Sequence, residues 1–196
     1  WRRKAKGASL ISVQADEATV LSSDISGQSL RMSDGCRYHI SLLGKYQISN
    51  VVTAVAALKV LKAGGMKIPE SAVESGLAAA RWKGRLEIVL RSPLILIDGA
   101  HNLDGAEALA DSLSELFPNK HIVFVMGVLA DKDVDAIIDT VLPLAERFLT
   151  VAPSNPRALP AEVLAGKLRE RGCEAEPFSS ASEAIDERRP DRKSVV

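Results

Sequence analysis

The fold of this chain is decided around the stretch Leu94-Ile95-Leu96-Ile97-Asp98-Gly99-Ala100-His101-Asn102. Its four apolar residues predict a short strand, and the small and polar residues after them predict a turn before a helix. In an open α/β sheet, ligands bind outside the carboxyl ends of the strands, so Asp98 and His101 can face one pocket. Gly99 and Ala100 leave room for a ligand to approach the backbone.

Asp98 and His101 also have ordinary structural interpretations. An Asp at the end of a strand often caps the following helix, and a loop histidine often has only local hydrogen bonds. The functional interpretation therefore depends on what surrounds these two residues in the rest of the chain.

From Leu86 onward, strand patterns alternate with helix patterns. Strands are predicted at residues 86–90, 94–97, 122–126 and 148–151, with a weaker one near 174–178. Two apolar stripes at helical spacing lie between them, from Leu103 to Phe117 and from Val134 to Ala145. This alternation predicts an α/β fold with a Rossmann-like, mainly parallel, doubly wound sheet.

The carboxyl ends of these strands are expected to place three polar segments on one rim. The segments are Asp98 with His101, Asp131-Lys132-Asp133, and Ser154-Asn155-Pro156-Arg157. The second also has the composition of an ordinary helix cap, so we assign it no catalytic role. Arg157 is a candidate for contact with an anionic group of a substrate.

The first part of the chain has a different pattern. Short strands are predicted at residues 10–13, 18–21, 29–32 and 38–42, with turns that indicate a β-meander. A helix over 48–63 follows, with Ser49 or Asn50 placed to cap it and Gly64-Gly65 placed to end it. Pro69 begins a second helix that runs to about Ala80.

Composition excludes several classes of partner. The 196 residues include 25 basic and 25 acidic side chains, so there is no net charge to attract nucleic acid or an anionic membrane. No apolar run approaches the ~20 residues that cross a bilayer. Cys36 and Cys173 lie far apart and lack metal-like spacing, which is typical of reduced thiols in a cytoplasmic protein. We expect a cytoplasmic protein whose partners are small molecules.

Five segments carry a resemblance to a known family. They are Gly44-Lys45-Tyr46-Gln47-Ile48-Ser49-Asn50, Trp82-Lys83-Gly84-Arg85-Leu86-Glu87, Asp98-Gly99-Ala100-His101-Asn102, Asp131-Lys132-Asp133 and Asn155-Pro156-Arg157-Ala158. The third resembles the signature of the Mur-ligase superfamily. The other four are similar to segments of its folylpolyglutamate synthase and dihydrofolate synthase branch, with Tyr46 where that branch usually has His. The chain resembles the carboxyl-terminal portion of such an enzyme.

The resemblance implies an ATP-dependent ligase in which an acyl phosphate is attacked by an amino acid. It implies ATP and Mg²⁺ as cofactors, and L-glutamate with folate or dihydropteroate as substrates. It places Asp98 and Arg85 near the nucleotide, His101 near the acyl phosphate or the incoming glutamate, and Asn50 near the adenine. Asp98 and His101 are thus the implied catalytic residues. Arg85 could equally form an interdomain salt bridge, and Asn50 could cap a helix.

The resemblance also implies that this chain is a piece of a longer, monomeric enzyme. It contains no Gly-x-x-x-x-Gly-Lys-Ser/Thr phosphate loop. We expect that loop and the magnesium ligands to precede Trp1, no metal site in this chain, and no turnover by the chain alone. Residues 1–81 are expected to form the end of a central domain, and residues 82–85 to form the linker after it. Residues 86–196 are expected to form a carboxyl-terminal domain that is truncated at its end. The charged run at 186–193 leads us to expect about ten disordered or neighbour-held terminal residues.

Two other functions stay open at this point. A Mur ligase of peptidoglycan synthesis shares the Asp98–Asn102 signature, and a Rossmann-like binding module without catalysis has the same predicted fold. The Asp131–Asp133 and Asn155–Ala158 segments favour the folate branch.

Overall fold

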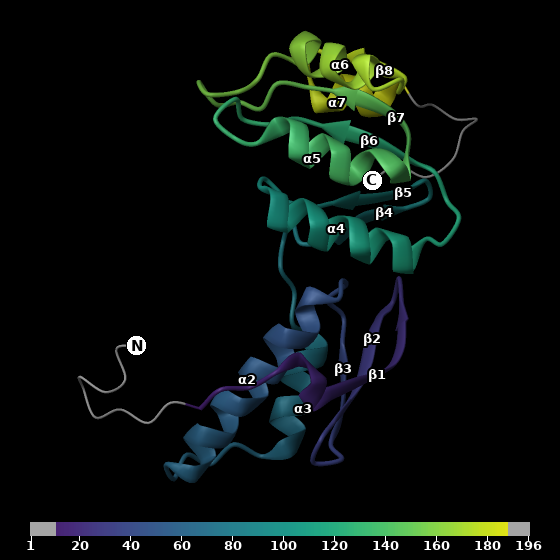
Figure 1. Ribbon diagram of the computed structural model, residues 1–196. Coiled ribbons are helices and arrows are strands. Elements are labelled where there is room, and N and C mark those ends of the chain that lie inside the picture. The colour runs from purple at the N-terminus through teal and green to yellow at the C-terminus, as the bar shows by residue number, and fades with distance from the viewer. Residues whose placement is uncertain (1–10, 188–196) are drawn as a thin grey trace, which may run out of the picture. The chain divides into compact units, whose positions relative to one another are not determined.

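A computed structural model describes residues 11–187 of the chain (Figure 1). The chain divides into two compact units, Trp1–Arg81 and Trp82–Val196. The expectation for the charged carboxyl-terminal residues lies outside the described part, as does Leu10 of the first predicted strand. Within residues 11–187, no helix has both the length and the hydrophobicity that a membrane crossing requires.

The first unit contains the predicted β-meander. Its antiparallel sheet has the order β1-β2-β3, formed by β1 (Ala18–Asp24), β2 (Gly27–Met32) and β3 (Arg37–Ile40). The strand expected over 10–13 is wrong for its described residues, which are irregular and lead into the 3₁₀ turn η1 (Ala15–Glu17). Ile11 is exposed, and Val13 packs on the core from a loop, so neither apolar residue reflects strand pairing.

Two helices complete this unit, α2 (Tyr46–Ala63) and α3 (Glu70–Ala79). Their apolar side chains pack with the sheet in one core that includes Leu30, Ile40, Val52, Val55 and Val73. The predicted end of α2 at Gly64-Gly65 is confirmed, since Gly64 is its C-cap and Gly65 has a φ of 95°.

The predicted cap of α2 by Ser49 or Asn50 is wrong, because the helix begins earlier and Lys45 occupies its N-cap position. Gly44 has a φ of 98°, which lets the chain turn sharply there. The buried amide of Gln28 donates hydrogen bonds to the carbonyls of Leu42 (2.9 Å) and Gly44 (3.1 Å). These long-range contacts hold the turn, so α2 needs no side-chain cap.

One ion pair in this unit predicts a pH dependence of stability. Lys59 Nζ lies 2.6 Å from Asp34 Oδ2, and this hydrogen bond, with that from the Cys36 amide, lowers the pKa of Asp34 from 3.8 to about 2. A lowered folded-state pKa gives stability that is present above about pH 4 and is lost as pH falls toward 2. Both side chains are more than a third exposed, so the contribution is at most about 1 kcal/mol.

We therefore expect Asp34→Asn to lower the free energy of unfolding near neutral pH and to have little effect near pH 2. Urea titrations of both proteins at several pH values measure this difference. A difference that is the same at about pH 6 and about pH 2 would contradict the assigned ion pair.

The second unit contains the Rossmann-like α/β fold that the alternating pattern predicted. Three parallel strands, in the order β6-β7-β8, are β6 (Ile122–Met126), β7 (Ala145–Thr150) and β8 (Ala175–Pro177). The two earlier strands, β4 (Glu87–Arg91) and β5 (Leu94–Ile97), instead pair antiparallel as a hairpin. Only two residues separate them, and a parallel pair needs a crossover of about a dozen.

Helices lie on both faces of the parallel strands. The helices of this unit are α4 (Leu103–Leu116), α5 (Val134–Val141), α6 (Ala161–Glu170) and α7 (Ala181–Asp186). Val123 and Leu149 pack with Ala184 of α7 on one face. Thr150 projects from the opposite face and donates a hydrogen bond to the carbonyl of Ala161 in α6 (2.8 Å). The sheet is therefore covered on both sides, as a doubly wound fold requires.

The apolar stripe that was expected to run to Ala145 ends earlier. The helix α5 stops at Val141, a 3₁₀ turn η2 (Leu142–Leu144) follows, and Ala145 is the first residue of β7. Pro143 in that turn has no amide proton and cannot extend the α-helical ladder. The strand therefore begins three residues before its predicted start.

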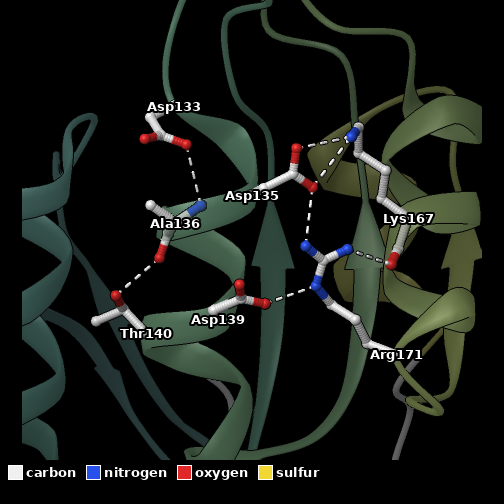
Figure 2. A network of polar contacts seen from close by, with 7 residues as sticks. All are labelled: Asp133, Asp135, Ala136, Asp139, Thr140, Lys167 and Arg171. Carbon is white, nitrogen blue, oxygen red and sulfur yellow. Dashed lines mark hydrogen bonds and ion pairs between the residues drawn. The ribbon is translucent and has the colours of Figure 1, made fainter.

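An ionic network joins α5 to the end of α6 (Figure 2). Arg171 donates through Nε to Asp139 (2.6 Å) and through Nη2 to Asp135 (2.8 Å), while Lys167 Nζ lies 3.0 Å from both oxygens of Asp135. Hydrogen bonds from Lys167 and Arg171 lower the pKa of Asp135. The forked guanidinium of Arg171 thus bridges two carboxylates one helical turn apart.

We expect Arg171→Lys to lower the melting temperature by about 1–3 °C, because a lysine cannot make both contacts. The difference should shrink at about 1 M salt, where charges are screened within about 3 Å. Differential scanning calorimetry at low and high salt measures it. A loss that does not depend on salt would indicate that Arg171 acts through packing instead.

Candidate functional site

The loop after β5 is organised by the carboxylate of Asp98. Its Oδ2 accepts a hydrogen bond from the amide of Leu86 (2.9 Å), and its Oδ1 accepts one from the amide of Ala100 (2.8 Å). The residue that caps α4 is Asn102, whose Oδ1 accepts a hydrogen bond from the amide of Gly105 (3.0 Å). The capping interpretation of Asp98 is therefore wrong, and its carboxylate instead joins two chain segments.

The segment held by Asp98 is the turn Gly84–Leu86. Gly84 and Leu86 have φ values of 67° and 47°, and the Leu86 side chain is buried at 2% exposure. The left-handed region is unfavourable for a leucine by about 1–2 kcal/mol. The carbonyl of Gly84 accepts a hydrogen bond from the amide of Gly99 (2.9 Å). The amide of Gly84 donates one to Oε2 of Glu87 (2.8 Å). Two hydrogen bonds, Leu86 to Asp98 and Gly99 to Gly84, therefore join this turn to the Asp98 loop in one assembly, and one more within each segment stabilises it locally.

Arg85 lies between the two left-handed residues of this turn and is exposed. A side chain added at Gly99 would begin 3.3 Å from the Gly84 carbonyl oxygen and 3.8 Å from Nη1 of Arg85, so the guanidinium lies close to Gly99. Among the described residues of its own unit, Arg85 has no ion-pair partner. An exposed cation without an ion-pair partner beside Gly99 is suited to a phosphate or carboxylate.

His101 is exposed on the same loop. Its Nδ1 lies 2.9 Å from the carbonyl oxygen of Gly99. Since a carbonyl only accepts, Nδ1 carries the donated proton and Nε2 is left as the open atom of the ring. The arginine of the Gly84–Leu86 turn and the oriented imidazole of the Asp98 loop thus both lie near Gly99.

The two other predicted rim segments are joined to each other. The amide of Ala130 donates to the carbonyl of Arg157 (2.8 Å), and Arg157 Nη1 pairs with Oδ2 of Asp131 (2.7 Å). Asp133 caps α5 by accepting from the amide of Ala136 (3.2 Å), so the capping interpretation of this segment is confirmed. The Asp98 loop follows the antiparallel β4–β5 hairpin. Its hydrogen bonds run to the Gly84–Leu86 turn and, among the described residues, not to the other two segments.

Asn50 lies in the other unit, inside α2, and is exposed. Its Nδ2 donates a hydrogen bond to Oε1 of Gln47 (2.9 Å), which orients the side-chain amide. Among residues 11–187, its Oδ1 has no hydrogen-bond partner and can accept one from a ligand.

Sequence reasoning did not identify Glu87 or the backbone of Leu86 as parts of this assembly. The glycine before Arg85 was an available signal, because a left-handed turn there brings the next residues back toward the strand ends. Within the described part of the chain, no three His, Cys, Asp or Glu side chains lie close enough to hold a metal ion.

Residues 84–193 match the family described as Mur ligase, glutamate ligase domain. The chain is 37% identical over 135 residues to the dihydrofolate synthase/folylpolyglutamate synthase of Mycobacterium tuberculosis, and 39% identical over 132 residues to the folylpolyglutamate synthase of Lacticaseibacillus casei. These matches cover 68% and 66% of this chain but only 28% and 30% of the relatives.

Solved structures agree with this result. A folylpolyglutamate synthase of Mycobacterium tuberculosis complexed with ADP has a TM-score of 0.74 at 34% identity, over 87% of this chain and 39% of that one. FolC of E. coli in complex with ADP, without folate substrate, has a TM-score of 0.75 at 28% identity, over 98% of this chain and 44% of that one.

Proposed function

Because this chain belongs to the Mur ligase, glutamate ligase domain family, we propose that it is the carboxyl-terminal part of an ATP-dependent carbon–nitrogen ligase. The ligase adds L-glutamate to a folate, or to dihydropteroate, through an acyl phosphate. Phosphate is a far better leaving group than hydroxide, so the amine of glutamate can then form the amide. The protein contributes mainly position and charge.

The observation that carries this proposal is the Asp98–Asn102 loop with Arg85 beside it, within the matched family region. The exposed guanidinium close to Gly99 suits the phosphates of a nucleotide or an acyl phosphate. Gly99 supports this because a side chain there would contact the Gly84 carbonyl at 3.3 Å and occupy the approach to the backbone. ATP, when bound, supplies the phosphoryl group that activates the carboxylate.

Each candidate residue takes a separate role in this proposal. Arg85 binds phosphate oxygens, and His101 directs Nε2 toward the acyl phosphate or the incoming glutamate. Asn50 offers its Oδ1 to the adenine, from its own unit. Asp98 organises the loop that carries His101. No described residue is assigned to Mg²⁺, because the described part of the chain offers no cluster of ligands for it.

We also propose the organisation of the longer enzyme. Residues 1–81 end a Mur-type central domain, residues 82–85 link, and residues 86–196 belong to the carboxyl-terminal domain. Both cysteines are free thiols, which supports a reducing cytoplasmic location. The enzyme is proposed to act as a monomer on small-molecule substrates.

A chimera tests the proposed function. In it, this chain replaces the matched carboxyl-terminal part of the Mycobacterium tuberculosis relative. The chimera, this chain alone and the remaining part alone are each given ATP, Mg²⁺, L-glutamate and either tetrahydrofolate or dihydropteroate, and products are identified by mass spectrometry. We expect a glutamylated product from the chimera alone.

Product from a nucleotide-sugar peptide substrate would indicate a peptidoglycan ligase instead. A chimera that folds and binds ATP yet glutamylates neither pterin would contradict the proposal, provided the unmodified relative is active in parallel.

Two variants of His101 separate its ring chemistry from its loop contact. His101→Ala is expected to lower the turnover number of the chimera by roughly tenfold to hundredfold. His101→Asn can retain the hydrogen bond to the Gly99 carbonyl but lacks Nε2, so it should lose about as much. Turnover measured with saturating substrates decides this, and full activity of His101→Asn would restrict His101 to holding the loop.

A further inference from the structure

Arg85 is held in a backbone conformation that the chain does not adopt by preference. Gly84 before it and Leu86 after it both have positive φ values, 67° and 47°. Leucine has no chemical reason to occupy the left-handed region, so surrounding contacts must hold it there. Burial of the Leu86 side chain is one such contact, and hydrogen bonds to its neighbours are the others.

Two carboxylates supply hydrogen bonds to this turn, in addition to the Gly99 amide that donates to the Gly84 carbonyl. Oδ2 of Asp98 accepts from the amide of Leu86 (2.9 Å), on the carboxyl side of Arg85. Oε2 of Glu87 accepts from the amide of Gly84 (2.8 Å), on its amino side. Oδ1 of Asp98 is used by the amide of Ala100 (2.8 Å), so both oxygens of Asp98 hold backbone.

We propose that Asp98 and Glu87 are positioning residues, whose carboxylates brace the Gly84–Leu86 turn and so fix the backbone from which the Arg85 guanidinium extends. Neither acid needs to touch the substrates for this role. The part of the inference that concerns phosphate rests on the proposed function of Arg85. The brace itself rests only on the contacts within this unit.

The number of acceptors distinguishes the two acids. Asp98 accepts on two different oxygens, and an asparagine has only one acceptor oxygen, so Asp98→Asn leaves an N–H facing an NH₂ group. Glu87 accepts only one of these bonds, and a glutamine can still provide that acceptor. If negative charge were the important property, the two amide variants would be equally damaging.

Amide hydrogen exchange measured by NMR on this chain tests the brace. We expect Asp98→Asn to speed exchange of the Leu86 amide at least tenfold, and Glu87→Ala to speed exchange of the Gly84 amide similarly. Glu87→Gln should leave the Gly84 amide within about twofold of the original chain. Arg85→Ala should leave both amides unchanged, because the turn holds Arg85 and not the reverse.

Unchanged exchange of Leu86 in Asp98→Asn would overturn the inference. If Asp98→Asn fails to fold, the two Glu87 variants provide the test. Equal exchange of the Gly84 amide in Glu87→Ala and Glu87→Gln would then overturn the inference. Exchange of the Ile122–Met126 amides reports whether a variant has instead loosened the whole unit.

A double-mutant cycle in the chimera tests the link to Arg85. We expect the loss of kcat/KM for ATP caused by Asp98→Asn to be at least tenfold larger when Arg85 is present than in an Arg85→Ala background, where only the loss that acts through the His101 loop remains. A merely structural role would give equal losses in both backgrounds and would overturn positioning through Arg85. An inactive chimera in which the exchange results hold would count against the proposed function and leave the brace standing.

Discussion

Replacing Arg85 by alanine is expected to lower kcat/KM for ATP in the glutamylation assay by roughly 10²–10³-fold. A preorganised charge aimed at a developing negative charge contributes about this much in other enzymes. The structure supports a large effect because the guanidinium is exposed, lies close to Gly99 and has no ion-pair partner among the described residues of its unit. Steady-state kinetics of the chimera with varied ATP measure the change.

Arg85→Lys is the matched control for this prediction. It keeps the positive charge but loses the planar fork, so a loss between those of alanine and arginine is expected. Full activity of Arg85→Ala would remove the phosphate role and would favour the interdomain salt bridge as the reason for an arginine at this position.

Replacing Phe148 by alanine is expected to destabilise the second unit by about 3–5 kcal/mol. Phe148 is fully buried in β7, and its ring stacks on Phe124 with centroids 5.3 Å apart and an interplanar angle of 19°. The substitution leaves a cavity between the sheet and its covering helices, and it removes the aromatic pair. Urea unfolding and amide exchange in β6 and β7 measure the loss.

Phe148→Leu serves as the control, because it keeps most of the volume and should cost roughly 1–1.5 kcal/mol. Amides of β2 in the first unit provide an internal reference within each sample. A loss of less than about 1 kcal/mol for Phe148→Ala would mean that neighbouring side chains close the cavity.

Much of the second unit could be predicted from the spacing of its apolar residues. The positions of β5, β6 and α4 agree with the sequence patterns. The agreement arises because the spacing of apolar residues in each segment matches the spacing of the side chains that the fold buries. The pairing of β4 with β5 followed from a two-residue connection that the overall alternation obscured. The early start of α2 depended on Gln28, a residue 14 and 16 positions from its two bonding partners.

In the candidate site, too, some features could be predicted from the sequence and others could not. By itself, the sequence determined the chemistry present at the end of β5: a carboxylate, an imidazole, two small residues and a cap at Asn102. Only the tertiary structure decided which group does what. Asp98 could have capped α4, and it binds Leu86 instead, because the left-handed turn around Arg85 brings a distant amide within 2.9 Å.

The physical reason is that helix capping and hydrophobic periodicity depend on residues only a few positions apart. They can therefore be predicted from the sequence. Whether a carboxylate bonds the next turn or a residue twelve positions away depends on which amide the folded backbone leaves unpaired nearby. That choice is made only when β4 pairs with β5, because the register that sets Glu87 opposite Ile97 brings Leu86 next to Asp98.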